Sequence, residues 1–462
     1  MAASGTATRL LSEAWQALSG EPELPAPLTL TGTSVALESV FPVMDVAAAA
    51  AGAALLAASL LEATRTGRPP APVALDLGHL ACAIRSERYV QLDGQRLRES
   101  GFAPLSRFFP TADGWIRLHA NYPWHRQRVL DVLGSSASLE NVASAVAGWT
   151  SEQLEDAIVS AGGCAAAVRG VDAWRAHPQG AAVSGLPLLR VDPDGAAARF
   201  ELPPAGQLPA SGIRVLDLTR VIAGPVCTRT LAAHGADVLR IDSPDLPETP
   251  AFAHDSLAGK RSALLDLHRA DDRARFEALL GEAHVLVQGY RPGALARFGL
   301  APDELLDRHP GLVVLSLSAW SHAGPWAHRR GFDSLVQAAS GIAASEAAGD
   351  AAPGVLPAQL LDHATGYLAA AAVLFGLARR QRTGTGCSAR VSLSQTAAWL
   401  LRQPQQPRSG RPPEVDPTPY LVELDGPEGT VHLISPPGRL ANRPATWPTA
   451  PARYGADPPA WR

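Results

Sequence analysis

The chain has 462 residues, which is too long for one ordinary hydrophobic core, so two or three domains are expected. Hydrophobic residues make up 46% and charged residues 18%, as in soluble globular proteins, and a formal net charge of −4 argues against general nucleic-acid binding. Four isolated cysteines indicate neither a disulfide framework nor a zinc site, and the N-terminus lacks the apolar core of a signal peptide, so we expect a cytoplasmic protein with reduced thiols.

The first segment, residues 1–84, contains one strong helical pattern. Asp45 is followed by an Ala- and Leu-rich stretch that ends at Gly67, and a strand-like Val-Ala-Leu follows at 73–75. The apolar run 46–61 is short and weakly hydrophobic for a bilayer span. It predicts a buried core helix and no membrane segment.

Residues 85–205 have a different texture, which predicts a small α+β domain. The segment F-F-P-T-A-D-G-W at 108–115 leads into a predicted strand at 116–119. Helical patterns follow at 124–133 and 152–161.

The segment 206–402 alternates strand-like and helical patterns and is predicted to be the large domain. Predicted strands lie at 213–218, 236–242, 262–267, 284–288 and 312–317, and predicted helices at 228–234 and 270–280. Short apolar strands separated by helices predict an α/β fold, a Rossmann-like parallel sheet covered by helices. Ligands of such sheets bind at the carboxyl ends of the strands. The first strand-end loop reads R-V-I-A-G-P, so a G-x-G-x-x-G dinucleotide site is not indicated.

The last segment, 403–462, is predicted to be a Pro-rich linker and a tail. The linker spans 403–419, and two strand-like pieces follow at 420–423 and 430–434. The Pro- and Gly-rich end from Pro436 onward predicts a chain that wraps a surface without adding to a core.

Two stretches of the chain repeat each other. The segments 45–67 and 362–384 lie 317 positions apart, align without a gap and share eight of 23 residues. Each starts with Asp, ends with Arg-Thr-Gly and is followed by a Val-x-Leu strand pattern. An internal repeat governs the interpretation of the fold. Here it also raises the question of which repeated aspartate, Asp45 or Asp362, is a catalytic residue.

Basic residues flank successive predicted strands of the large domain. They are Lys260, Arg261, Arg291, Arg297, Arg329 and Arg330. Each cation alone is more typical of a solvated surface charge. Loops that meet at one sheet edge would bring them together, and such a cluster suits phosphate groups. A ligand such as coenzyme A (CoA) fits this pattern, with Tyr290 or Phe332 available to cover an adenine.

Six motifs in order carry a resemblance to a known family. They are V-L-D-L-T-R-V-I-A-G-P (215–225), H-G-A-D-V-L-R-I-D (234–242), G-K-R-S-A-L-L-D-L (259–267), Y-R-P-G-A-L-A-R-F-G-L (290–300), G-F-D-S-L-V-Q-A-A-S-G (331–341) and the helix from Asp362 to R-T-G-T-G (382–386). Residues 212–400 thereby resemble the large domain of the family III CoA-transferases. That group includes formyl-CoA and carnitine CoA-transferases and α-methylacyl-CoA racemases.

The resemblance implies a set of site residues and partners. Asp362 corresponds to the family's catalytic aspartate. CoA contacts are expected at Ile222, Ala223, Leu257, Lys260, Arg261, Gly289, Tyr290, Arg291, Arg297, Arg329, Arg330 and Phe332. CoA would be a substrate, with no metal and no tightly bound cofactor. The expected partners are an acyl-CoA and a carboxylic acid, without nucleic acid or membrane, and the expected assembly is a homodimer.

The position of Asp362 before a helix allows two interpretations. A carboxylate at a helix N-terminus is favoured in its ionised form by the dipole and free N–H groups, and it could attack a thioester. The plain alternative is an N-cap, the commonest role of Asp at that place. With the resemblance, catalysis is favoured at Asp362. Asp45 lacks preceding CoA-binding loops and is a weaker candidate, and the neighbouring His363 is expected to have no role.

Three functions remain open from the sequence. Racemase relatives need a histidine before the aspartate of a G-H-D motif, and Phe332 stands there, which favours CoA transfer over a racemase or isomerase. A non-catalytic CoA-binding protein is the third possibility. The small domain precedes the large one, contrary to the family order, so the chain resembles two fused copies, each incomplete. A Gly-rich loop that closes over the aspartate is not evident.

Overall fold

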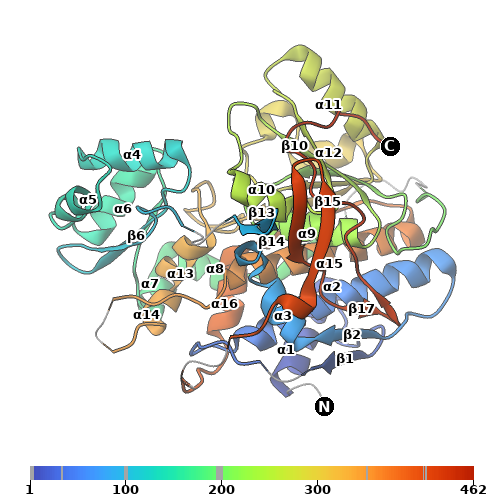
Figure 1. The fold of residues 1–462 in the computed structure, drawn as a ribbon, viewed down its shortest axis with the longest axis horizontal. Coiled ribbons are helices and arrows are strands. Elements are labelled where there is room, and N and C mark those ends of the chain that lie inside the picture. The colour runs from blue at the N-terminus through green and yellow to red at the C-terminus, as the bar shows by residue number, and fades with distance from the viewer. Residues whose placement is uncertain are drawn as a thin grey trace.

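The computed structural model describes residues 5–32, 35–97, 102–193, 201–349, 352–408, 410 and 414–462. Residues 409 and 411–413 of the predicted linker therefore lie outside the described residues. Figure 1 shows a main body built around parallel strands and, beside it, a lobe that contains helices α4 (Pro123–Leu133), α5 (Leu139–Val146) and α6 (Ser151–Ser160).

The main body is organised by a seven-stranded sheet. Its strands are β8 (Leu189–Asp192), β9 (Arg214–Leu218), β10 (Asp237–Asp242), β11 (Arg261–Leu264), β12 (Val285–Gln288), β13 (Val313–Ser318) and β14 (Cys387–Ser392). The order is β11-β10-β9-β12-β13-β14-β8, in which only β8 runs antiparallel to its neighbour. The six parallel strands follow the order of a Rossmann fold, and the direction of strand addition reverses between β9 and β12. The predicted α/β class is confirmed.

Helices cover both faces of this sheet because its strands are apolar on both sides. Val215 packs into the core shared with α9 (Ala223–Ala233) and α15 (Leu360–Thr383), whereas its neighbour Leu216 packs with Phe276 of α11 (Ala270–Glu282). The remaining helices of this domain are α10 (Pro250–Ser256), α12 (Pro302–Arg308), α13 (Asp333–Ser340), α14 (Ile342–Ser345) and α16 (Leu393–Leu401).

The two repeats form matching helices that pack against each other. Helix α2 (Val43–Thr66) and helix α15 each have 24 residues. Each ends at a left-handed glycine, Gly67 or Gly384, whose N–H binds the carbonyl four residues earlier. By length and composition alone both helices could cross a membrane, yet 83% and 94% of their most apolar windows are buried inside the fold. This burial confirms the predicted core helix at 46–61.

The first segment builds a smaller sheet together with the tail. Strands β1 (Leu28–Thr31) and β2 (Val73–Asp76) run parallel, and β17 (Arg439–Leu440) and β18 (Arg443–Pro444) extend this sheet. Helix α1 (Gly5–Ser19), which the sequence analysis did not predict, packs on α2. The tail does more than wrap a surface, because Leu440 and Trp447 are buried in hydrophobic clusters.

Three short elements join the first segment to the tail and the large domain. Helix α3 (Leu77–Ala83) follows β2, and a 3₁₀ turn, η1 (Ser86–Arg88), follows α3. Strands β3 (Gln91–Leu92) and β4 (Gln95–Arg96) then join a hairpin of β15 (Leu421–Gly426) and β16 (Gly429–Ile434). The hairpin confirms the two strands predicted in the tail.

The lobe lies within the predicted small domain, residues 85–205, while β3 and β4 join the sheet of the tail and β8 joins the large sheet. Strands β5 (Phe108–Pro110), β6 (Trp115–Leu118) and β7 (Ala165–Ala167) form its sheet, and the three helices of the lobe cover one face. The other face contacts α13 of the large domain. The predicted strand and both predicted helices are confirmed, while α5, α7 (Val171–Ala176) and α8 (Pro178–Ser184) were not predicted.

Candidate active site

The predicted CoA-binding loops meet where the sheet changes direction. Ile222 and Ala223 follow β9 and begin α9, and Gly289 and Tyr290 follow β12, the neighbouring strand. The N–H of Gly289 donates to the carbonyl of Leu218, which holds the two strand ends together. Ligands of open α/β sheets bind at this switch point. The structure therefore brings these four predicted residues to one place.

Backbone strain marks two loops at the same edge. Val221, between β9 and α9, has a φ of 68°, and Ser321, after β13, has a φ of 82°. A positive φ is a genuine outlier for a β-branched residue and costs on the order of 1–3 kcal/mol. The N–H of Val221 donates to the Glu248 carboxylate at 3.1 Å, which helps to hold the strained residue. Such strain persists where the surrounding structure fixes it, as it does at functional sites.

Asp362 lies in the first turn of α15 but is not its N-cap. The N-cap residue is Gln359, and it makes no capping hydrogen bond through its side chain. Four residues beyond Asp362, a Cβ on Gly366 would lie 2.6 Å from the carbonyl oxygen of Ala223. This close approach presses the start of α15 against the start of α9. The simple capping interpretation of Asp362 is wrong, and its carboxyl group belongs to the switch-point region.

A second carboxylate, Asp333, stands beside Asp362. The backbone N–H of Asp362 donates to Oδ2 of Asp333 at 3.0 Å, and the side-chain amide of Gln337 donates to Oδ1. Burial raises the pKa of Asp362 well above its usual value, and the charges of Asp333 and Glu87 add to the effect. Burial also raises the pKa of Asp333, to about 6. The expectation that the helix N-terminus keeps Asp362 ionised is therefore reversed.

His363, expected to have no role, links the large domain to the 3₁₀ turn η1. Its Nε2 lies 3.1 Å from Oε2 of Glu87 on η1, and both side chains are buried. Burial raises the pKa of Glu87, but the hydrogen bond and charge of His363 outweigh it, and the net pKa is lowered. The turn η1 thus supplies the Glu87 carboxylate to the neighbourhood of Asp362.

Two of the predicted cations, Arg291 and Arg330, bind only carbonyl groups among the described residues. Arg291 donates to His328 at 3.2 Å, and Arg330 donates to Gly162 of the small domain at 3.3 Å. Burial and the charge of Arg330 lower the pKa of Arg291, so the two guanidinium groups lie near each other. Neighbouring cations without a carboxylate partner are suited to an anionic ligand.

Three other predicted cations are already paired and do not offer a free charge. Lys260 is buried, and its Nζ binds Asp217 at 3.0 Å. Arg261 binds Asp237 at 2.8 Å, and Arg329 binds Glu155 and Asp156 of the small domain, each at 2.9 Å. These side chains shape the loops and join the domains, and CoA contact at their positions stays a prediction.

The other predicted contacts differ in accessibility. Leu257 is fully buried beside the loop that holds Lys260. Arg297 is on the surface, with its guanidinium 3.2 Å from Nε2 of His268. Asp45 is half-buried in the first turn of α2.

The small domain covers Phe332 with a histidine. The ring of His119 stacks on Phe332 with centroids 3.7 Å apart, and His125 meets the same ring edge-on at 5.9 Å. Tyr122 donates a hydrogen bond to Glu248 of the large domain at 2.6 Å. Burial lowers the pKa of both histidines, that of His125 to about 4. Neutral imidazoles therefore lie over the loop that carries Asp333.

Several residues of this site were not among those predicted from the sequence. Asp333 had a signal, because it follows Phe332 in the G-F-D motif. Glu87 and His119 had none, since only the fold brings their segments to α15 and α13. In the described part of the chain, no group of three or more His, Cys, Asp or Glu side chains could hold a metal ion.

Comparisons with known proteins agree with the motifs. Residues 210–415 match the family model described as CoA-transferase family III. The chain is 37% identical over 207 residues to an acetyl-coenzyme A transferase from Hypoxylon pulicicidum, an alignment that covers 43% of this chain and 35% of that protein. It is 33% identical over 205 residues to a probable fatty acyl-CoA transferase from Mycobacterium tuberculosis, covering 42% of this chain and 52% of that protein. A formyl-CoA:oxalate CoA-transferase from Escherichia coli is 32% identical over 206 residues, covering 42% and 50%.

Among solved structures, a CAIB/BAIF family protein from Brucella suis is 27% identical, with a TM-score of 0.39, and the match covers 48% of this chain and 64% of that one. This chain spans about half, or less, of the length of the curated relatives it matches. The resemblance seen in the motifs is confirmed: residues 210–415 match the model of CoA-transferase family III.

Proposed function

We propose that this protein moves CoA from an acyl-CoA thioester to a carboxylic acid, with Asp362 as the nucleophile. The observation that carries the proposal is the position of Asp362. It is a buried carboxyl group in the first turn of α15, packed against the strained loop at the switch point of a family III domain. CoA is the shared substrate of both half-reactions, and no tightly bound cofactor is needed.

The reaction proceeds in two half-reactions on one carboxylate, each with one attack by a carboxylate and one by the CoA thiolate. An oxygen of Asp362 attacks the thioester carbonyl, the C–S bond breaks, and a mixed anhydride and CoA thiolate result. The thiolate attacks the aspartyl carbonyl, which releases the first acid and leaves an aspartyl-CoA thioester. The acceptor carboxylate attacks that thioester to form a second mixed anhydride, and the thiolate then attacks the acceptor's carbonyl. The products are a new acyl-CoA and the free Asp362 carboxylate.

The electrostatics assign tasks to the neighbouring groups. Because the pKa of Asp362 is raised, its carboxyl group must lose a proton before it can attack. The hydrogen bond from its own backbone N–H fixes Asp333 beside it, and Arg291 and Arg330 offer positive charge for an anionic substrate. The reaction should therefore be slower in acid, where the carboxyl pair is protonated.

The repeat provides a matched control for the test of Asp362. We would expose the wild-type protein, Asp362→Asn and Asp45→Asn to an acyl-CoA and hydroxylamine, and look for an aspartyl hydroxamate by mass spectrometry. We expect modification at residue 362 in the wild type and in Asp45→Asn. Asp362→Asn should lose CoA exchange between acids. Exchange at the wild-type rate in Asp362→Asn would refute the proposal.

A racemase or isomerase is the second candidate, and one observation favours it. Phe332 lacks a proton-accepting group, but the His119 ring stacked on it brings an imidazole to the same loop. Deuterium incorporation at the α-carbon of a 2-methylacyl-CoA, lost in His119→Phe and without CoA exchange between acids, would identify this activity. CoA binding without turnover over a broad acid panel would instead indicate a non-catalytic protein. The homodimer and the cytoplasmic location stay predictions.

A further inference from the structure

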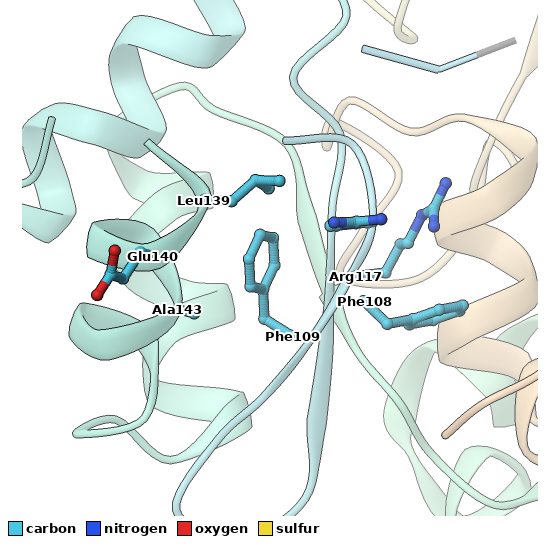
Figure 2. Close-up of a pocket in the computed structure, with 7 residues that line it drawn as sticks. Phe108, Phe109, Arg117, Leu139, Glu140 and Ala143 are labelled. Atoms are coloured by element: carbon cyan, nitrogen blue, oxygen red, sulfur yellow. The ribbon is translucent and has the colours of Figure 1, made fainter. Parts of the chain in front are cut away.

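A groove on the small domain lies outside the residues that surround Asp362. It has a volume of about 570 Å³ and is open to solvent on one side. Its walls are formed by Arg107, Phe108, Phe109, Arg117, Leu139, Glu140 and Ala143. Figure 2 shows Phe109 between two walls, with Leu139 and Ala143 of α5 on one side and Arg117 and Phe108 on the other. This volume lies in the range of small-molecule sites, about 300–1,000 Å³.

Arg117 is the unusual residue of this groove. It is only 5% exposed, and its buried Nε has no hydrogen-bond partner. The guanidinium lies over the rings of Phe102 and Phe108, at 4.6 Å and 4.9 Å from their centroids. Within the described ranges no carboxylate forms an ion pair with Arg117. Burying a cation without an anionic partner costs folding free energy, so an anion bound in the groove would be stabilised by Arg117.

Arg107 adds a second positive charge to the groove. Arg107 lines the same groove, and burial together with the Arg107 charge lowers the pKa of Arg117 to about 10. Asp333 of the large domain acts on Arg117 in the opposite direction but makes no hydrogen bond to it. Glu140 directs its carboxylate away from Arg117 (Figure 2), so it does not neutralise the pair. An anion bound between the two guanidinium groups would satisfy both.

The opposite wall is apolar. Leu139 is 40% exposed, one of the few large hydrophobic side chains left open to solvent in the described part of the chain. Phe109 and Ala143 continue this wall behind it. Inorganic phosphate would bind the arginines but leave the apolar wall exposed to water. An organic anion would bind the arginines and also bury the apolar wall.

We propose that this groove binds a free carboxylic acid with a short apolar body, its carboxylate on Arg117 and Arg107 and its hydrocarbon against Leu139. Arg117 connects the groove to the candidate active site through rings. Its guanidinium lies over Phe102, Phe102 meets His119 edge-on at 6.2 Å, and His119 stacks on Phe332. The acid could be the acceptor or the released acid of the proposed transfer, which is the only part that rests on the proposed function. Binding itself requires no turnover.

Calorimetry on the full chain tests the binding, with hexanoate as the probe. The uncharged hexanamide and inorganic phosphate serve as comparison ligands. We expect Arg117→Met to weaken hexanoate binding by roughly tenfold or more, as expected for a hydrogen bond to a charged group. Arg128→Met, an exposed arginine on α4, is the matched control and should bind as the wild type does. Leu139→Glu places a like charge on the exposed wall, carries little folding risk, and should also weaken binding.

Three results of the titrations with the two groove variants and the comparison ligands would overturn the proposal. They are unchanged hexanoate affinity in both Arg117→Met and Leu139→Glu, equal affinity for hexanamide, or equal affinity for phosphate. Loss of hexanoate binding in Asp362→Asn would also overturn it, because the acid would then occupy the catalytic centre. If CoA transfer is absent but hexanoate still binds and the binding depends on Arg117, the proposed function is refuted and the acid-binding groove is supported. A higher KM for the acceptor acid in Arg117→Met, at unchanged kcat, would identify the ligand as the acceptor.

Discussion

Replacing Asp333 with Asn should change how the stability of the protein depends on pH. In the folded protein, burial raises the pKa of Asp333 to about 6, against 3.8 for the free side chain. The native state therefore favours the protonated form of this carboxyl group. Asn mimics that form in shape and in lack of charge, and its oxygen can still accept the hydrogen bond from the Asp362 N–H.

The size of the expected change in unfolding free energy follows from the linkage between protonation and folding. A shift of about two pKa units corresponds to about 3 kcal/mol, because each unit is about 1.36 kcal/mol. The folded pKa of Asp333 lies above the unfolded one, so its favourable contribution is fully present below pH ~4 and is lost as the pH rises through ~6. From pH 4 to 7 the wild type should thus lose up to about 3 kcal/mol relative to Asp333→Asn. The amide group that Asn presents to Gln337 adds a cost that does not depend on pH and cancels in the comparison.

Urea unfolding, followed by tryptophan fluorescence at pH 4, 5, 6 and 7, measures this difference. The free energies of unfolding of wild type and Asp333→Asn should diverge as the pH rises, with the variant becoming relatively more stable. Asp303→Asn, at an exposed position of α12, should follow the wild type at every pH. Parallel curves for wild type and Asp333→Asn would refute the argument that Asp333 is a buried carboxyl group with a raised pKa.

Three further substitutions test the packing around the site. Lys260→Met leaves the buried carboxylate of Asp217 without its cation and should cost about 3–5 kcal/mol of unfolding free energy, measured in urea. Gly366→Val places a side chain 2.6 Å from the carbonyl oxygen of Ala223 and should cost about 1–3 kcal/mol, measured as a lower Tm. Tyr122→Phe removes the hydrogen bond to a buried glutamate of the large domain and should cost about 1–3 kcal/mol in the same thermal assay.

Two of these substitutions, Lys260→Met and Gly366→Val, have a counterpart elsewhere in the chain. Arg297→Met removes a surface cation and should change the stability by less than about 1 kcal/mol. Gly281→Ala adds a methyl group with no atom within 4 Å and should stabilise α11 by roughly 0.5–1 kcal/mol. Equal losses for Lys260→Met and Arg297→Met would contradict the buried ion pair. A Tm for Gly366→Val at or above that of the wild type would contradict the close packing of α15 on α9.

The parallel sheet could be predicted from the sequence because its apolar strands are short and separated by helical patterns. The start of α9 could not. The segment R-V-I-A-G-P was interpreted as a turn because Gly and Pro usually interrupt helices. In the structure the helix begins at Ala223, and Pro225 occupies its first turn, where a missing N–H costs little. Local composition alone does not distinguish a turn from a helix start that contains Pro.

The paired and unpaired cations of the site also could not be distinguished from the sequence. The partner of Lys260 is Asp217, 43 positions earlier, and the partner of Arg329 is Glu155, 174 positions earlier. Loop placement brought the right segments together, but it did not show which charges the fold had already neutralised. Among the predicted cations, and counting partners in the described ranges alone, Arg291 and Arg330 are the two whose guanidinium groups bind only carbonyls.

The repeat is more than a remnant of fusion, because the first copy supports the site of the second. Helix α2 packs along α15, the 3₁₀ turn after α3 places Glu87 on His363, and the small domain that follows lays His119 on Phe332. The first copy contributes the short parallel pair β1–β2 to a small sheet, whereas the predicted CoA-binding loops follow strands of the large sheet. Asp45 thus shares the helix pattern of Asp362, whereas the strand-end loops of the large sheet belong to the second copy. Under the proposed function, Asp362 carries the chemistry and the first copy supports it.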